Sequence, residues 1–117
     1  MNTKLIPPLL AAMCTGALGQ QTQALDSPMT AAGFACEELQ YPAAALRAET
    51  TGKTVVAFSV SADGVVNQAE VKTSAGRKRE HKLLDFVALQ HVRSCKVSAK
   101  ASVQPGSYSH EFVWLIR

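Results

Sequence analysis

The chain has 117 residues, enough for one small domain, of which 47% are hydrophobic and 18% are charged. This composition is typical of a folded globular protein and excludes both a membrane-embedded helix bundle and a disordered chain. The formal net charge is only +3, a balance that does not indicate nucleic-acid binding.

The first residues are typical of a secretory signal peptide. Lys4 gives a positive start, and residues 5–18 are largely apolar but too few to cross roughly 30 Å of hydrocarbon as a helix. We predict a signal peptide over residues 1–19, with 1–24 as the alternative, and no stable membrane span after cleavage. Lipidation of Cys14 is disfavoured, because a methionine precedes it where a small residue would be expected.

Residues 20–35 are small and polar, contain Pro28 and Gly33, and show neither helical nor strand periodicity. We predict a short flexible lead-in over this stretch. A single domain is then expected over residues 36–117.

Two cysteines remain in the mature chain, Cys36 and Cys95. An even pair in an exported protein predicts a disulfide, which would close a loop of roughly 60 residues and stabilise the fold by about 4 kcal/mol. His91 lies four residues before Cys95, but no further Cys or His stands at metal-binding spacing. A redox role would need a Cys-x-x-Cys pair, which the sequence lacks. We therefore expect a structural disulfide, no metal site and no cofactor.

Pro42 predicts the start of a short helix, since the missing N–H of proline costs nothing in the first turn. Alanines and Leu46 continue it as good helix formers, and Gly52 marks its end. Tyr41, just before this helix, is interpreted as a packing residue rather than as a ligand contact.

A β-hairpin is predicted over residues 54–73. On its first strand, three apolar side chains share the better-buried face: Val56, Phe58 and Val60. Asp63-Gly64 is a strong turn signal, because glycine accepts the positive φ that such turns require. On the return strand, the expected core face holds Val65, Ala69 and Val71, and the expected wet face holds Val66, Gln68, Glu70 and Lys72.

A second helix is predicted over residues 83–97, with Leu84, Ala88, Val92 and Cys95 on one apolar face. A disulfide from this face would pin the N-terminal arm across the core. His91 lies beside the stripe and is interpreted as a boundary residue rather than as a ligand or an acid/base group.

A short basic run precedes this helix and is made of Arg77, Lys78, Arg79 and Lys82. The simpler interpretation is a solvated loop. The alternative is a docking loop for an acidic partner or a membrane surface.

The last strand is predicted after the turn at Pro105-Gly106. Its alternating side chains include Tyr108, His110, Phe112 and Trp114. Because this strand is the last in the chain, we expect it at a sheet edge, where unpaired backbone groups can template a partner strand.

The order of helix, strand, turn, strand, helix and strand over residues 39–116 resembles the C-terminal domain of TonB-type energy transducers. The matching motifs are Gln40-Tyr41-Pro42-Ala43, Gly52, Phe58-x-Val60-x-x-Asp63-Gly64-x-Val66, Ser74-x-Gly76, and Leu84-Asp85 with Ala88. The resemblance implies an α+β fold in the order αββαβ, with an antiparallel three-stranded sheet packed on helices.

In that family the domain works in the periplasm, and its last strand or a nearby edge pairs with a short extended segment of an outer-membrane transporter. The resemblance therefore implies a periplasmic, non-enzymatic module that binds a protein partner by strand addition. The implied partner-binding residues are Gln40, Tyr41, Tyr108, His110, Phe112 and Trp114.

Three departures from the family pattern limit what the resemblance implies. Arg93-Ser-Cys95-Lys96 replaces an aromatic end of the second helix, and the link from Gly76 to Leu84 is longer than usual. We also expect neither an uncleaved membrane anchor nor a long spacer, so coupling to an ion-driven motor is not expected.

Two other functions compete with partner binding by strand addition. A stand-alone periplasmic inhibitor, immunity or envelope-assembly protein would keep this fold but use another surface, such as the basic run. An enzyme would need groups drawn from a set without catalytic spacing: Asp63, His81, Asp85, His91 and His110. We expect no catalytic residues.

Overall fold

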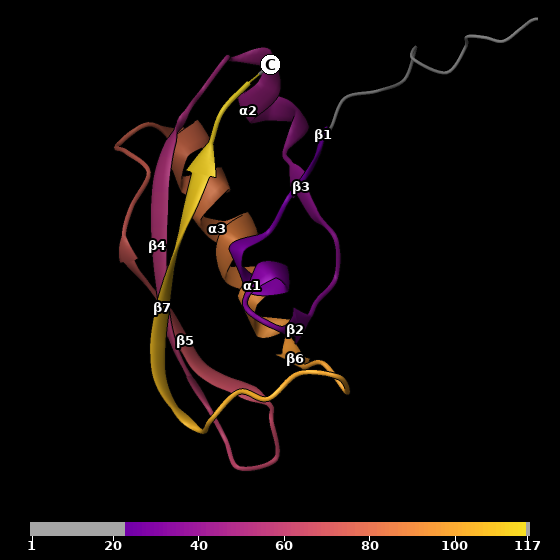
Figure 1. The fold of residues 1–117 in the computed structure, drawn as a ribbon. Coiled ribbons are helices and arrows are strands. Elements are labelled where there is room, and N and C mark those ends of the chain that lie inside the picture. Colours follow the sequence, from indigo (N-terminus) through magenta and orange to yellow (C-terminus); the bar gives the residue numbers. More distant parts are fainter. Residues whose placement is uncertain (1–22, 117) are drawn as a thin grey trace, which may run out of the picture.

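A computed structural model describes residues 23–116 (Figure 1). The elements in chain order are β1 (Gln23–Leu25), α1 (Pro28–Ala31), β2 (Phe34–Ala35), β3 (Leu39–Tyr41), α2 (Ala43–Arg47), β4 (Gly52–Val60), β5 (Val66–Thr73), α3 (Arg79–Arg93), β6 (Lys96–Val97) and β7 (Gly106–Trp114). The predicted signal peptide over residues 1–19, with Cys14, lies outside the described residues. Within residues 23–116, every helix is too short or too polar to cross a membrane.

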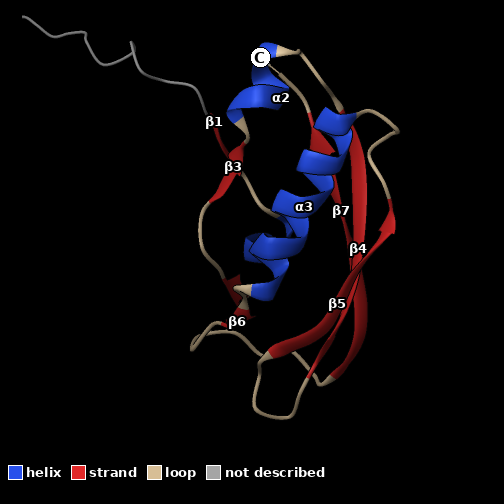
Figure 2. Ribbon diagram, turned by 180° about the vertical axis from the view of Figure 1, so that it is seen from behind, coloured by secondary structure: helices blue, strands red, loops and turns tan. Residues whose placement is uncertain are grey.

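The main sheet is antiparallel, has three strands and follows the order β5-β4-β7. Helix α3 contacts β4 and β5 and lies along one face of this sheet, as seen from behind in Figure 2. Two small ladders, β1 with β3 and β2 with β6, stand beside it. The predicted α+β class, with an antiparallel three-stranded sheet packed on helices, is confirmed.

The hydrophobic core lies between α3 and the inward face of the sheet. On β4, Val56, Phe58 and Val60 are 0%, 3% and 4% exposed, so the predicted alternation is confirmed. Leu84, Ala88 and Val92 are the buried stripe of α3. Burying one such aliphatic side chain stabilises a fold by about 1.5 to 3 kcal/mol, so these two facing rows hold the layers together.

The expected lead-in carries secondary structure from Gln23 onward, which corrects the prediction of an irregular stretch. Ser27 begins α1, because its Oγ accepts a hydrogen bond from the backbone N–H of Met29 at 3.0 Å. Met29 and Phe34 are 0% and 3% exposed, and the Phe34 ring meets the edge of Phe58 with 5.7 Å between centroids. Two apolar anchors therefore fix this segment to the core.

The hairpin confirms the turn at Asp63-Gly64 but corrects one predicted face of β5. Gly64 has φ of +80°, and its N–H donates to the backbone O of Ser61 at 2.9 Å. Val66 is buried whereas Val65 is 48% exposed, the reverse of the expectation. The pairing with β4 shifts register beside Gln68, which has φ of +50°. This bulge inserts one residue and reverses the alternation before it.

Helix α3 begins and ends four residues earlier than the predicted stretch of 83–97. At its start, His81 Nδ1 accepts from the backbone N–H of Lys78 at 3.2 Å, and Nε2 contacts the backbone O of Thr51 at 3.1 Å. At its end, Val97 leaves the helix because it pairs with Phe34 in the β2–β6 ladder. The C-terminal end of α3 is therefore set by pairing with a segment distant in the sequence, and helical periodicity alone could not predict it.

A buried polar network joins α3 to the sheet. Asp85 on α3 accepts hydrogen bonds from Thr54 Oγ1 at 2.9 Å, from the backbone N–H of Ala75 at 2.8 Å and from Ser74 Oγ. Thr54 Oγ1 in turn accepts from Trp114 Nε1 at 3.0 Å. The carboxylate therefore joins α3 to β4 and to the link after β5, and Thr54 extends the network to β7.

Candidate functional site

The main candidate for partner binding is the outer edge of β7. Strand β4 holds one side of β7 in unbroken antiparallel register, from Gly52 opposite Trp114 to Val60 opposite Gly106. Among residues 23–116, no strand pairs with the other side of β7, so the expected edge position is confirmed. Such an edge presents a row of backbone N–H and C=O groups that can template an added strand.

Strand β5 forms the opposite edge of the sheet and is less regular. Its pairing with β4 shifts register twice, between Val55 and Val56 and between Ala57 and Ser59. Bulges bend and twist a strand, which opposes pairing with another chain. Of the two edges of this sheet, β7 is therefore the better template.

The side chains of β7 divide between two faces. On the inward face, Tyr108 and His110 are half-buried, whereas Phe112 and Trp114 are 2% and 0% exposed. On the outward face, Val113 is 46% exposed. A partner strand at this edge would therefore meet the backbone of β7 and, on the outward face, the exposed side chain of Val113.

The two candidate residues before the first predicted helix lie in β3, outside the main sheet. Gln40 is exposed, and its Nε2 donates to Glu38 Oε1 at 3.0 Å. Tyr41 is fully buried, donates through its hydroxyl to the backbone O of Thr50, and meets the Trp114 ring edge-on at 5.4 Å. The interpretation of Tyr41 as a packing residue agrees with this position, and only Gln40 offers its side chain to a partner.

The expected docking loop is divided between two structures. Arg77 and Lys78 are exposed in the link before α3, whereas Arg79 and Lys82 belong to the first turn of α3. This corrects the prediction of one continuous loop. The helix begins early because His81 ties its first turn to the backbone of Lys78.

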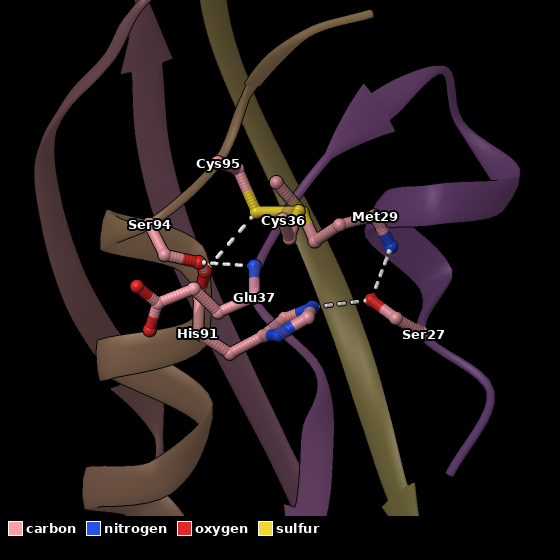
Figure 3. Close-up of a disulfide and its surroundings, with 7 residues drawn as sticks. All are labelled: Ser27, Met29, Cys36, Glu37, His91, Ser94 and Cys95. Atoms are coloured by element: carbon pink, nitrogen blue, oxygen red, sulfur yellow. Dashed lines mark hydrogen bonds between the residues drawn. A yellow bond between two sulfur atoms is a disulfide. The ribbon is translucent and has the colours of Figure 1, made fainter.

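The predicted disulfide is present between Cys36 and Cys95 and joins the segment after β2 to the residues after α3 (Figure 3). One helical turn before Cys95, His91 is 6% exposed, so the interpretation as a boundary residue is wrong. Its Nε2 lies 2.6 Å from Ser27 Oγ, and the segment of Ser27 covers the ring. Sequence periodicity missed this contact because the two residues are 64 positions apart.

Burial lowers the pKa of His91, and the nearby backbone and carboxylate of Glu37 partly oppose this change. Nδ1 of His91 is buried and forms no hydrogen bond with the described residues. The ring also meets Phe112 edge-on, with 5.9 Å between centroids. His91 is therefore a buried ring held by Ser27 on one nitrogen.

The three histidines do not share a pocket in the described part of the chain. His81 contacts the backbone of Thr51, His91 contacts Ser27, and His110 stacks on Phe58 with 5.7 Å between centroids. The structure therefore places the three rings in separate surroundings.

The stability of the fold is expected to fall as the pH drops from about 7 to about 5, in part because of His110. Burial lowers the pKa of His110 in the folded state. The unfolded chain has the ordinary value near 6.5 and therefore binds more protons over this range, so the free energy of unfolding decreases on acidification. Urea unfolding of wild type and His110→Gln at both pH values checks this. The variant should show the smaller decrease, and an equal decrease would contradict the assignment.

Residues 37–114 match the family model for the Gram-negative bacterial TonB protein C-terminal. Neither the curated proteins nor the solved structures give a significant match.

Proposed function

We propose a function on the basis of the family, because the chain belongs to the TonB C-terminal domain family. The protein is a periplasmic module that binds an extended segment of a protein partner by adding it as a fourth strand beside β7. TonB-type domains are protein-interaction domains and typically work in the periplasm. The partner class that the family suggests is an outer-membrane transporter, which would link this module to TonB-dependent transport.

The single observation that carries the proposal is the regular outer edge of β7, beside which no other strand of residues 23–116 pairs. Backbone pairing gives affinity with little demand on the partner's sequence, and alternate side chains set the choice of partner. Val113 offers an exposed apolar contact at this edge. The wet face of β5 carries charged Glu70 and Lys72 instead.

Titration with synthetic extended peptides from outer-membrane transporters of the same cell tests this proposal. We expect amide shifts in the NMR spectrum to concentrate on residues 106–114, and amides at the outer edge of β7 to become protected from hydrogen exchange. N-methylation of alternate peptide residues should abolish binding for one set and spare the other, because only every second residue of an added strand bonds to the edge.

A pair of matched variants sharpens the test. Val113→Lys on β7 should weaken peptide binding about tenfold, which corresponds to about 1.4 kcal/mol of lost apolar contact. Val65→Lys, at an equally exposed valine in the hairpin, should leave binding unchanged. No binding at millimolar peptide would refute strand addition. Shifts centred on Arg77 and Lys78 would favour the alternative, a periplasmic inhibitor or assembly protein that uses the basic surface.

A further inference from the structure

Apart from the edge of β7, the region around the disulfide contains a second candidate site, made of possible metal ligands. Cys36, His91 and Cys95 each offer one ligand atom, and these atoms all lie within 4.8 Å of one another. They come from the segment after β2, from α3 and from the turn after α3 (Figure 3). While the two sulfurs are bonded to each other, they cannot bind a cation as thiolates.

His91 already has the arrangement of a metal-binding histidine. Ligand histidines usually bind the metal through one ring nitrogen and hold the other nitrogen in a hydrogen bond that fixes the ring. Here Nε2 contacts Ser27 Oγ, which is itself held by the backbone N–H of Met29. Nδ1 is buried without a hydrogen-bond partner among the described residues, although buried polar atoms are normally satisfied.

A cleft of about 510 Å³ opens beside these groups and gives an ion a route to them. Its lining includes Cys36 and His91 together with three carboxylates: Asp26, Glu37 and Glu38. Acidic side chains around a cleft raise the local concentration of cations. The cleft also leaves room for a water molecule beside Cys36 and His91.

We propose that the reduced form of this protein binds Zn²⁺ through the sulfur atoms of Cys36 and Cys95 and through Nδ1 of His91, with water as the fourth ligand. Two thiolates and one imidazole with an open fourth position form a known zinc donor set. At about 2.3 Å from one zinc ion, two tetrahedral thiolates lie about 3.7 Å apart. Rotation of the cysteine side chains provides this separation once the S–S bond is broken.

The chemistry needs a reductant of the dithiol class. The dithiol transfers two electrons and two protons to the disulfide, so the S–S bond breaks, two thiols form, and the dithiol itself becomes a disulfide. Zn²⁺ then replaces the two thiol protons, which pass to solvent. The disulfide and the zinc site are therefore mutually exclusive states of the same two cysteines.

Zinc titration of the full mature chain, oxidised and after reduction by a dithiol that is then removed, tests the proposal. We expect one Zn²⁺ per reduced chain, a higher melting temperature of the reduced protein with zinc, and no such effect on the oxidised protein. Co²⁺ in place of Zn²⁺ should give the absorption bands of thiolate-bound tetrahedral cobalt. Zinc that binds the oxidised protein equally well, or no binding to the reduced protein, would overturn the proposal.

Matched variants distinguish zinc binding at the three-ligand site from zinc binding by the two thiols alone. His91→Gln keeps both cysteines and should lower the zinc affinity of the reduced chain about 100-fold, whereas His110→Gln should leave it unchanged. Ser27→Ala, which removes only the contact that fixes the ring, should lower it about tenfold. If His91→Gln does not fold when reduced, Ser27→Ala still tests the proposal. The proposed site depends on Ser27 to orient the His91 ring, so a wild-type zinc affinity in Ser27→Ala would contradict it.

Discussion

Replacement of Asp85 by alanine is expected to lower the free energy of unfolding by about 3 to 5 kcal/mol. The carboxylate accepts from Thr54, Ser74 and the backbone of Ala75 in a buried setting, and Asp85 itself is 7% exposed. Alanine would leave the Thr54 hydroxyl and the Ala75 N–H without this acceptor, whereas Ser74 could still donate to the backbone O of Gly76. Each buried unsatisfied group costs about 1 to 3 kcal/mol. Small domains have only about 5 to 15 kcal/mol of stability, so the variant should be close to unfolding.

The matched control is Asp85→Asn, which keeps the shape and one acceptor oxygen. Asn can still accept from Thr54 and Ala75, and its amide can donate to the Ser74 hydroxyl, so we expect a loss of only about 1 to 2 kcal/mol. The fluorescence of Trp114, the single tryptophan, reports the transition during urea unfolding. Equal losses in the two variants would show that the hydrogen bonds to the carboxylate are not the source of the effect.

Loss of the Cys36–Cys95 disulfide is expected to cost about 4 kcal/mol. The bond spans 59 residues, and the chain-entropy model assigns about this value to a loop of that length in the unfolded state. Cys36→Ser, Cys95→Ser and the double variant should therefore all lose nearly the same stability, because each removes the same bond. Reduction of wild type in a metal-free buffer should match them.

Urea unfolding with and without a dithiol checks this prediction on all four proteins. The reductant should change wild type alone, because the three variants have no disulfide to lose. A double variant that loses twice as much as either single variant would mean that the side chains act independently of the bond. A loss below about 1 kcal/mol would mean that contacts within the unfolded chain already restrict the loop.

Sequence reasoning succeeded where one local pattern decides the structure. The alternation of Val56, Phe58 and Val60, the Asp63-Gly64 turn, the stripe on α3 and the disulfide are all present in the structure. Each depends on residue types at a fixed spacing within one element, or on the pairing of the only two cysteines outside the predicted signal. The edge position of the last strand followed from its place in the chain.

The features that sequence reasoning missed are set by distant parts of the chain. The bulge at Gln68 reverses a face of β5 without any change in the sequence pattern around it. Ser27 followed by Pro28 is a helix-start signal, but α1 has only four residues, and its anchor Met29 is buried by elements that come later in the chain. Periodicity carries no information about such contacts.

Gly52 shows how a distant contact can still leave a mark on one residue. Its φ is +155°, and an added Cβ would lie 2.6 Å from the backbone O of Ala75. The sequence motif contains this glycine, but the reason for it is the link after β5, which passes close to the start of β4. The sequence therefore identifies Gly52 as a motif residue, but only the structure shows the close backbone contact that requires a glycine there.

The contrast between the two borders of the sheet also bears on stoichiometry and solubility. Because bulges interrupt the β5 side while β7 is regular, growth by strand addition has one direction only. If a partner segment pairs beside β7 as proposed, the bulges of β5 oppose a second addition at the other border of the sheet, which favours a complex of one module with one partner segment. The same asymmetry opposes the repeated stacking of copies that would lead to fibrils.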